Sequence, residues 1–185
     1  MILEKLRQAT NEIHVALENE TILRCFKDGS IDLMQYTSIL QRFYGFFKPL
    51  ESKVSLPGIE GVIEDFPNRR KAVLIESDLQ SLGQKPREDM APLPIFDIPS
   101  ALGALYVIEG STLGGMVISK ILKDHLGISR ENGGAYFQGY GKETASMWKS
   151  FVQKLQQYAQ QNPKDEDTII QGAVSTFRQL FEWMR

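Results

Sequence analysis

The sequence is poor in cysteine, in histidine and in net charge, and each shortage excludes a class of function. Its 185 residues include one cysteine, so the chain cannot form an internal disulfide or a CxxC redox or zinc site, and we expect a cytoplasmic protein. Neither of the two histidines follows a glutamate three residues earlier, which excludes the paired Glu-x-x-His motifs of di-iron bundles. The formal net charge of -2 gives no overall attraction to nucleic acid or to a membrane surface.

Long hydrophobic runs and common nucleotide or hydrolase motifs are also missing. The longest weakly polar stretch, residues 98–108, is about half the length that a bilayer requires, so we expect neither a transmembrane helix nor a signal peptide. GxGxxG, Walker, HExxH and GxSxG motifs do not occur in a suitable context. Hydrophobic residues make up 42% of the chain, which predicts one compact domain over residues 1–185.

Apolar residues recur every three or four positions through most of the chain, and no alternating strand pattern appears. The fold class expected is all-α, with about six main helices. The expected helices are 3–17; 33–50, with Asp32 as N-cap and a bend at Pro49; 68–82, with Asn68 as cap and Gly83 as its end; 100–126; 144–161, ended by Asn162; and 170–184. Residues 84–99 hold four prolines and are expected to form a surface connection. Residues 127–141 are expected to form a turn-rich loop with exposed or half-buried aromatic side chains.

The long helix expected over residues 100–126 contains four glycines, at 103, 110, 114 and 115. Each glycine costs about 1 kcal/mol relative to alanine in a helix, or about 4 kcal/mol together. Two explanations are open: another helix crosses closely, or the helix bends so that bare backbone lies against a flat ligand. Gly110 and Gly114 share one face, and the polar residues Glu109, Ser111 and Thr112 beside them favour a ligand site.

His14 borders the apolar face of the opening helix. A histidine at this position is explained by a core or boundary role, or by a role as an axial haem ligand. Glu18, one turn later, could orient the second ring N–H, and Arg7 could meet an anionic edge of the ligand. Both residues are equally explained as exposed ion-pair partners. His125 lies near a helix C-terminus, where the helix dipole favours it, and is given no catalytic role.

Two motifs resemble those of the haem oxygenases. Residues 6–14 (LRQATNEIH), followed by Glu18 and Asn19, resemble the proximal-helix motif of that family, and residues 104–115 (ALYVIEGSTLGG) resemble its glycine-rich distal helix. The motifs occur in the family's order, and the resemblance spans nearly the whole chain. It implies a helical haem-oxygenase fold in which His14 Nε2 is the proximal iron ligand and Glu18 interacts with the ligand's other nitrogen.

The resemblance also implies the contacts on the rest of the haem. The backbone of Gly110, Gly114 and Gly115 would cover the distal face beneath a kinked helix. Arg7 corresponds to a basic position that meets a haem propionate, and Lys149 is a second propionate partner. Where the family has a basic residue one turn after Lys149, this chain has Gln153. The resemblance therefore does not indicate which meso carbon is attacked.

One position of the distal motif departs from many family members. They carry an aspartate immediately after the first distal glycine, where it anchors the water network that delivers protons, and this chain has Ser111. A hydroxyl holds water but is a poor acid. Proton delivery would therefore use Ser111 or Thr112 with ordered water, or another polar group. The serine resembles that of bacterial members, some of which supply biliverdin to bacteriophytochromes.

The resemblance implies an enzyme that takes haem as both substrate and cofactor, consumes O₂ and electrons, and releases biliverdin, ferrous iron and CO. The chain has no nicotinamide, flavin or iron–sulfur motif, so a separate reductase or ferredoxin-like donor would supply the electrons. Two alternatives stay open. One is a non-catalytic haem carrier or sensor of the same fold, which the Ser111 departure favours. The other is a thiaminase-like all-α enzyme that does not bind haem.

Overall fold

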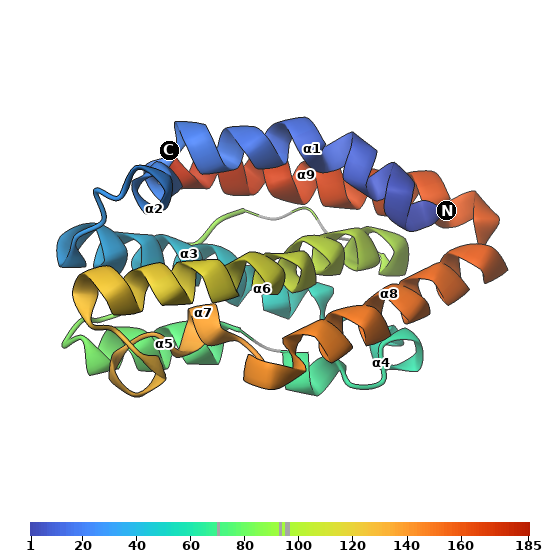
Figure 1. Ribbon diagram of the computed structural model, residues 1–185. Helices are drawn as coiled ribbons and strands as arrows, with labels where there is room; N and C mark the ends of the chain where they lie inside the picture. The colour runs from blue at the N-terminus through green and yellow to red at the C-terminus, as the bar shows by residue number, and fades with distance from the viewer. Residues whose placement is uncertain (70, 93, 95–96) are drawn as a thin grey trace.

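The computed structural model describes residues 1–69, 71–92, 94 and 97–185, and this part of the chain contains nine α-helices and no β-strand (Figure 1). Six helices are ten residues or longer, which confirms the expected all-α fold with six main helices. Three helices of four residues were not predicted. The helices are α1 (Ile2–Glu20), α2 (Cys25–Asp28), α3 (Leu33–Val54), α4 (Ile59–Val62), α5 (Ala72–Ser81), α6 (Ile98–Leu126), α7 (Ala135–Gln138), α8 (Thr144–Gln161) and α9 (Glu166–Met184).

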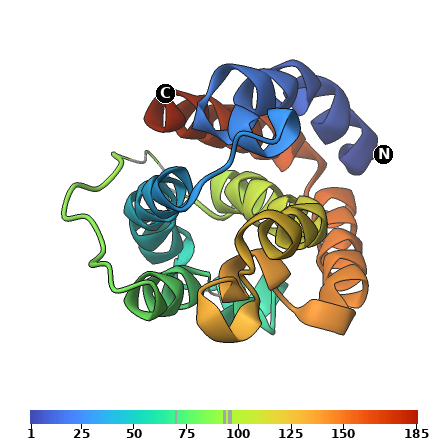
Figure 2. The same cartoon turned by 60° about the vertical axis from the view of Figure 1, so that its left-hand side comes forward.

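The helices form three layers with α6 at the centre. Helices α1 and α9 lie side by side in the upper layer of Figure 1, α3 and α6 lie beneath them, and α5 and α7 form the lower layer (Figures 1 and 2). Helix α9 packs on both α6 and α1, whereas α1 makes no comparable contact with α6 in the described residues. The α1 and α6 surfaces therefore face each other without closing on each other.

Local sequence signals fix several helix ends as expected. Asp32 caps α3 through a reciprocal capping box: its Oδ1 accepts from the Gln35 N–H at 2.7 Å, and Gln35 Oε1 accepts from the Asp32 N–H at 3.0 Å. Helix α3 continues past Pro49 to Val54. Gly83 follows α5 with a φ of +68°, and Asn162 ends α8.

Two expected boundaries were wrong. Asn68 does not cap α5, because it lies within a separate 3-10 turn (Phe66–Arg69) and the helix begins at Ala72. Pro99 does not belong to the connection of residues 84–99, because α6 already begins at Ile98 with Asp97 as its cap, and proline is tolerated in a first helical turn. Within that connection, residues 93, 95 and 96 lie outside the described part of the chain.

The aromatic residues after α6 are also more buried than expected. Tyr136 and Phe137 are 8% and 5% exposed, because α7 turns both side chains toward α3. Their rings lie 5.5 Å and 6.0 Å from the ring of Phe43. Tyr140 is half-buried, as expected.

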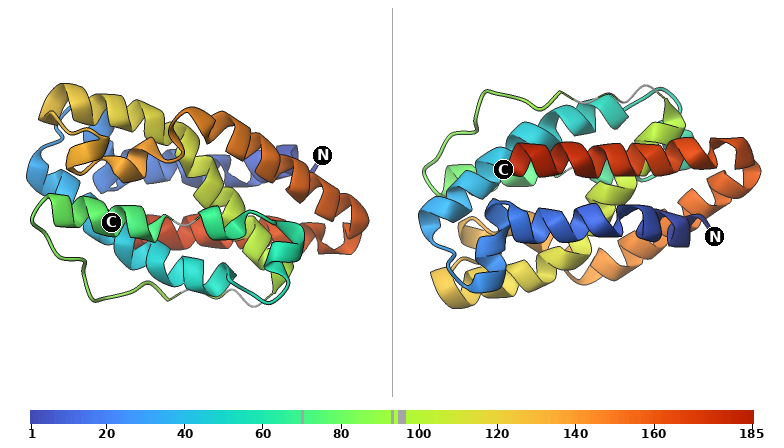
Figure 3. Two further views of the ribbon diagram at one scale, coloured as in Figure 1. Left: turned by 90° about the horizontal axis from the view of Figure 1, so that it is seen from below. Right: turned by 90° about the horizontal axis from the view of Figure 1, so that it is seen from above.

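Helix α6 runs through the middle of the fold. Among the described residues it alone is long and apolar enough to cross a membrane, but 61% of its 18-residue apolar window is buried inside the protein. The burial accounts for its composition as a core helix of a soluble fold. Figure 3 shows α6 changing direction about midway along its length.

Two of the four glycines of α6 allow close backbone packing. A Cβ atom at Gly103 would lie 2.1 Å from the Ile169 carbonyl oxygen of α9, and one at Gly172 of α9 would lie 2.5 Å from the Ser100 carbonyl oxygen. A Cβ atom at Gly115 would lie 2.5 Å from the Phe137 carbonyl oxygen of α7. Helix crossing therefore explains Gly103 and Gly115, but a different explanation is needed for Gly110 and Gly114.

Candidate functional site

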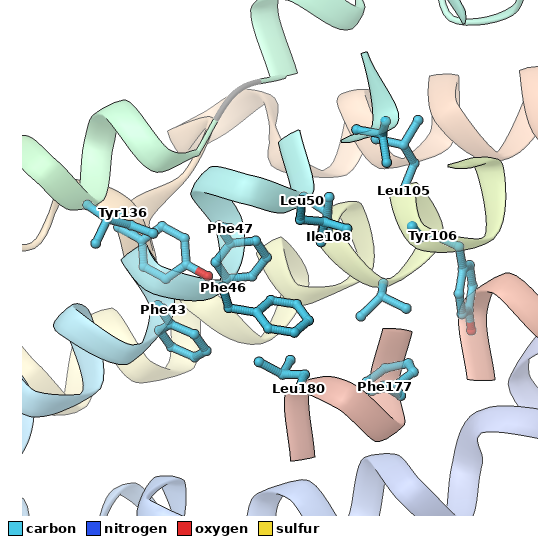
Figure 4. Packing of buried hydrophobic residues seen from close by; sticks show 14 of the residues in the cluster. Phe43, Phe46, Phe47, Leu50, Leu105, Tyr106, Ile108, Tyr136, Phe177 and Leu180 are labelled. Atoms are coloured by element: carbon cyan, nitrogen blue, oxygen red, sulfur yellow. The ribbon is translucent and has the colours of Figure 1, made fainter. Parts of the chain in front are cut away.

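The two sequence motifs form opposite walls of one cleft. The cleft has a volume of about 690 Å³ and lies between α1, which contributes His14, and α6, which contributes Gly110 and Gly114. This volume is within the usual range for small-molecule sites. Figure 4 shows part of the buried hydrophobic cluster; the labelled residues that also line the cleft are Phe43, Phe47, Tyr106, Tyr136, Phe177 and Leu180.

The α1 wall presents an imidazole with a carboxylate beside it. The His14 side chain is 52% exposed, and its ring packs edge-on against Phe177 with centroids 5.5 Å apart. Its Nδ1 lies 3.8 Å from Glu18 Oε1, which is longer than a direct hydrogen bond. With Nδ1 beside this carboxylate, Nε2 is the nitrogen available to a ligand.

Glu18 has a second partner that sequence reasoning missed. Lys27 of α2 reaches Glu18 Oε2 at 2.8 Å and also lines the cleft. The pair joins residues nine positions apart across the turn after α1, so helical spacing alone could not indicate it. One carboxylate is therefore shared between an ammonium and an imidazole.

The predicted basic residues differ in position. Arg7 lines the cleft from α1, near the buried hydroxyl of Tyr106. Burial raises the pKa of Tyr106, while Thr10 and the charge of Arg7 act in the opposite direction. Lys149 is exposed on α8 and is not among the residues that line the cleft, although the preceding Trp148 is. The structure therefore brings Arg7, but not Lys149, to the cleft.

On the α6 wall, Gly110 and Gly114 expose bare backbone to the cleft. A Cβ atom at Gly110 would lie 3.7 Å from Trp148, an ordinary contact, and one at Gly114 would meet nothing within 4 Å. No protein contact therefore requires glycine at either position. Gly115 also borders the cleft, but the approach of Phe137 from α7 already accounts for it.

Ser111 and Thr112 both line the cleft, and both hydroxyls bond to their own helix. Ser111 Oγ donates to the Ile108 carbonyl at 2.7 Å, and Thr112 Oγ1 donates to the Glu109 carbonyl at 2.6 Å. Hydrogen bonds of this kind often accompany a bend in a helix. The Ser111 side chain is exposed, whereas Thr112 is buried.

A buried ion-pair network lies directly behind Gly110. The carboxylate of Glu109 is fully buried; it accepts from Arg69 Nη1 at 2.5 Å, from Lys71 Nζ at 3.1 Å and from the Tyr140 hydroxyl at 2.9 Å. Arg69 also donates two hydrogen bonds to Asp65, at 2.9 and 2.7 Å. Burial acts to raise the pKa of Asp65, but Arg69 outweighs it and holds that pKa below its usual range.

The sequence contained a signal for this network, although its partners could not be named. Glu109 is the only charged residue between positions 98 and 119. A carboxylate in so apolar a helix, if buried, must be paired. Its partners Arg69 and Tyr140 are 40 and 31 positions away, a separation that no local pattern reveals.

The fold and the cleft define a helical protein able to hold a flat ligand between an imidazole and bare helix backbone. The family model of the heme oxygenases matches residues 1–185. The chain therefore belongs to the haem oxygenase family, whose members are enzymes that cleave haem.

Three similar proteins support this assignment. A heme oxygenase of Xanthomonas campestris is 30% identical, over 84% of this chain and 92% of that protein. A heme oxygenase of Takifugu rubripes is 20% identical, over 97% of this chain and 72% of that protein. The crystal structure of the NO- and CO-bound heme oxygenase from Neisseria meningitidis has a TM-score of 0.86 at 22% identity, covering 100% of this chain and 90% of that one, and shows the same fold. The thiaminase-like alternative and the non-catalytic carrier are not favoured by these relatives.

The neighbouring glycines 114 and 115 should respond oppositely to alanine. Because nothing lies near a Cβ at Gly114, Gly114→Ala should stabilise the ligand-free protein by about 1 kcal/mol through helix propensity. Gly115→Ala should destabilise it by about 1–3 kcal/mol, because the new methyl group meets the Phe137 carbonyl. Denaturant unfolding of the ligand-free variants measures both effects.

A hemin titration completes this comparison. Gly114→Ala should bind hemin at least about tenfold more weakly, because its methyl group enters the cleft. A Gly114→Ala variant that is less stable than the wild type, or that binds hemin equally well, would contradict the assignment of Gly114 to the ligand side of α6.

Proposed function

We propose that the cleft binds haem as substrate, with His14 Nε2 as the axial iron ligand and the backbone of Gly110 and Gly114 over the opposite face. The observation that carries this proposal is the pairing of the two walls. An imidazole on α1 faces two glycines on α6 that no protein contact requires. A flat ligand lying against the helix explains why side chains are missing at those two positions.

The charges around the cleft support a position for the haem propionates. Three cations among the described residues line the cleft, and two of them are paired, Lys27 with Glu18 and Lys71 with Glu109. Arg7 has no ion-pair partner among the described residues, so its guanidinium is free to bind a carboxylate. Lys149, next to Trp148, stays the predicted partner of the second haem propionate.

The chain's own residues then bind and orient the substrate, while haem supplies the iron at which O₂ reacts. Phe43, Phe47 and Phe177 exclude bulk water from the interior of the cleft. Glu18 holds the His14 imidazole in one orientation, directly or through water. Gly110 and Gly114 leave room for O₂ beneath α6.

We further propose that the 185 residues act as one haem oxygenase domain that releases biliverdin, ferrous iron and CO. A separate reductase or ferredoxin-like protein in the cytoplasm would supply the electrons, and a bacteriophytochrome is a candidate acceptor of the biliverdin. The lone cysteine, Cys25, is buried and needs no oxidising compartment.

Hemin reconstitution followed by turnover tests this function. With ascorbate or a reductase under O₂, we expect the Soret band of the complex to disappear as a biliverdin band grows, and chromatography of the tetrapyrrole identifies the isomer. A complex whose Soret band persists under these conditions would indicate a carrier or sensor. A chain that takes up no hemin would refute the haem site itself.

A further inference from the structure

The hydroxyl groups that line the cleft differ in where their protons point. Thr10 donates to the Leu6 carbonyl at 2.7 Å. The hydroxyls of Ser111 and Thr112 donate to α6 carbonyls, as described above. Two tyrosines also line the cleft, Tyr106 and Tyr136. In this structure the protons of these aliphatic hydroxyls point toward the carbonyls of their own helices and away from a ligand in the cleft.

The two tyrosine hydroxyls face different walls. Thr10 and Arg7 of α1 are the polar neighbours of the Tyr106 hydroxyl, which places it on the imidazole side. Tyr136 and Ser111 both line the cleft, and Ser111 is a polar neighbour of the Tyr136 hydroxyl, which places this hydroxyl on the glycine side. The backbone packing supports this position of Tyr136, because α7 approaches α6 closely at the contact between Phe137 and Gly115.

We propose that the phenol of Tyr136, held beside Ser111, is the hydrogen-bond donor to a ligand on the glycine face of the bound substrate. This inference rests on the proposed haem site and adds a residue to it. Ser111 Oγ already donates its proton to Ile108, so it offers Tyr136 an acceptor. The phenolic O–H rotates between Ser111 and a ligand that enters the cleft.

Tyr136 is fixed at both its backbone and its ring. The N–H groups of Ala135 and Tyr136 donate to the two carboxylate oxygens of Asp78 at 2.8 and 2.7 Å, which pins α7 to α5. The Tyr136 ring lies 5.5 Å from Phe43 and 5.8 Å from Phe47, and Figure 4 shows it beside both. A donor held in place before the ligand arrives needs no reorganisation when it binds.

Tyr136 also keeps its proton. Burial raises the pKa of its phenol well above the usual range. The residue therefore donates a hydrogen bond and does not act as an anion. The sequence left Ser111, Thr112 or another polar group as the source of the proton on this wall, and the proposal assigns this role to another polar group, Tyr136.

Fluoride binding to the ferric hemin complex tests the proposal, because the bound anion accepts a hydrogen bond from any donor on that face. Tyr136→Phe should weaken fluoride binding by about three- to tenfold, the loss expected for one hydrogen bond. Hemin affinity and the axial-ligand spectrum should be unchanged without fluoride, because the ring contacts remain. Biliverdin formation in a single turnover should slow by about the same factor.

Two further variants serve as controls. Tyr44→Phe removes the same oxygen from a buried tyrosine of α3 that does not line the cleft, and it should bind fluoride like the wild type. Ser111→Ala should leave fluoride binding within about twofold of the wild type, since the donor is retained. If Ser111→Ala loses the affinity and Tyr136→Phe does not, Ser111 is the donor and the proposal is overturned.

Hemin uptake and turnover by the wild type separate a failure of the haem site from a failure of the role of Tyr136. A wild-type chain that takes up no hemin refutes the proposed function, and this inference with it. A wild-type chain that binds hemin and forms biliverdin, combined with normal fluoride binding by Tyr136→Phe, overturns only the role of Tyr136.

Discussion

Replacing His14 with alanine is expected to abolish the axial-ligand spectrum of the hemin complex and to reduce biliverdin formation by more than about 100-fold. Loss of a residue that only orients a metal ligand costs about 10–100-fold, so loss of the ligand itself should exceed that range. The fold should persist, because the His14 side chain is 52% exposed and lines a cleft rather than the core. Absorption spectra and single-turnover assays measure the two effects.

Added imidazole should restore part of the spectrum of His14→Ala, because the deletion leaves space for it on the α1 wall. The matched control is His125→Ala. His125 is exposed near the C-terminal end of α6, outside the residues that line the cleft, and this variant should behave like the wild type. An unchanged axial-ligand spectrum in His14→Ala would show that another residue binds the iron.

The second large effect is expected from Glu109→Ala, which should destabilise the fold by about 3–5 kcal/mol. Its carboxylate is fully buried between Arg69 and Lys71, so removing it leaves two buried cations without their shared partner. For a chain of this size the melting temperature should fall by roughly 6–20 °C. Thermal and denaturant unfolding of the ligand-free protein measure the loss.

Glu64→Ala provides the comparison for Glu109→Ala. Glu64 pairs with Lys154 at 3.1 Å, but its side chain is 83% exposed, so its removal should cost less than about 1 kcal/mol. Similar losses from the two variants would mean that burial of the Glu109 network does not govern its contribution. Because Glu109 directly precedes Gly110, its variant should also bind hemin more weakly.

The helical periodicity of the sequence predicted the six long helices, whereas the opposition of His14 to the glycines of α6 was implied by the resemblance to the haem oxygenases. Long amphipathic helices repeat their pattern often enough to be recognised, and Asp32 and Gly83 mark their ends by local chemistry. Helix α7 has four residues and no measurable period, so the burial of Tyr136 could not be predicted.

Other features depended on contacts between distant parts of the chain. The glycines of α6 had two explanations, and only their neighbours in space separate Gly103 and Gly115, which meet other backbones, from Gly110 and Gly114, which do not. Partners such as Lys71 and Tyr140 follow from the tertiary arrangement, which no single helix encodes. Lys149, which was assigned by resemblance, is not among the residues that line the cleft, and its contact with a propionate stays a prediction.

The close backbone contacts of α6 have a consequence for substrate exchange. Gly103 and Gly115 lie on either side of Gly110 and Gly114, and they bring the α6 backbone against α9 and α7. The α6 wall of the cleft therefore has little freedom to move away from the ligand. Helix α1 packs mainly on α9. Exchange of a tetrapyrrole between these two walls should therefore depend mainly on fluctuations of the amino-terminal helix.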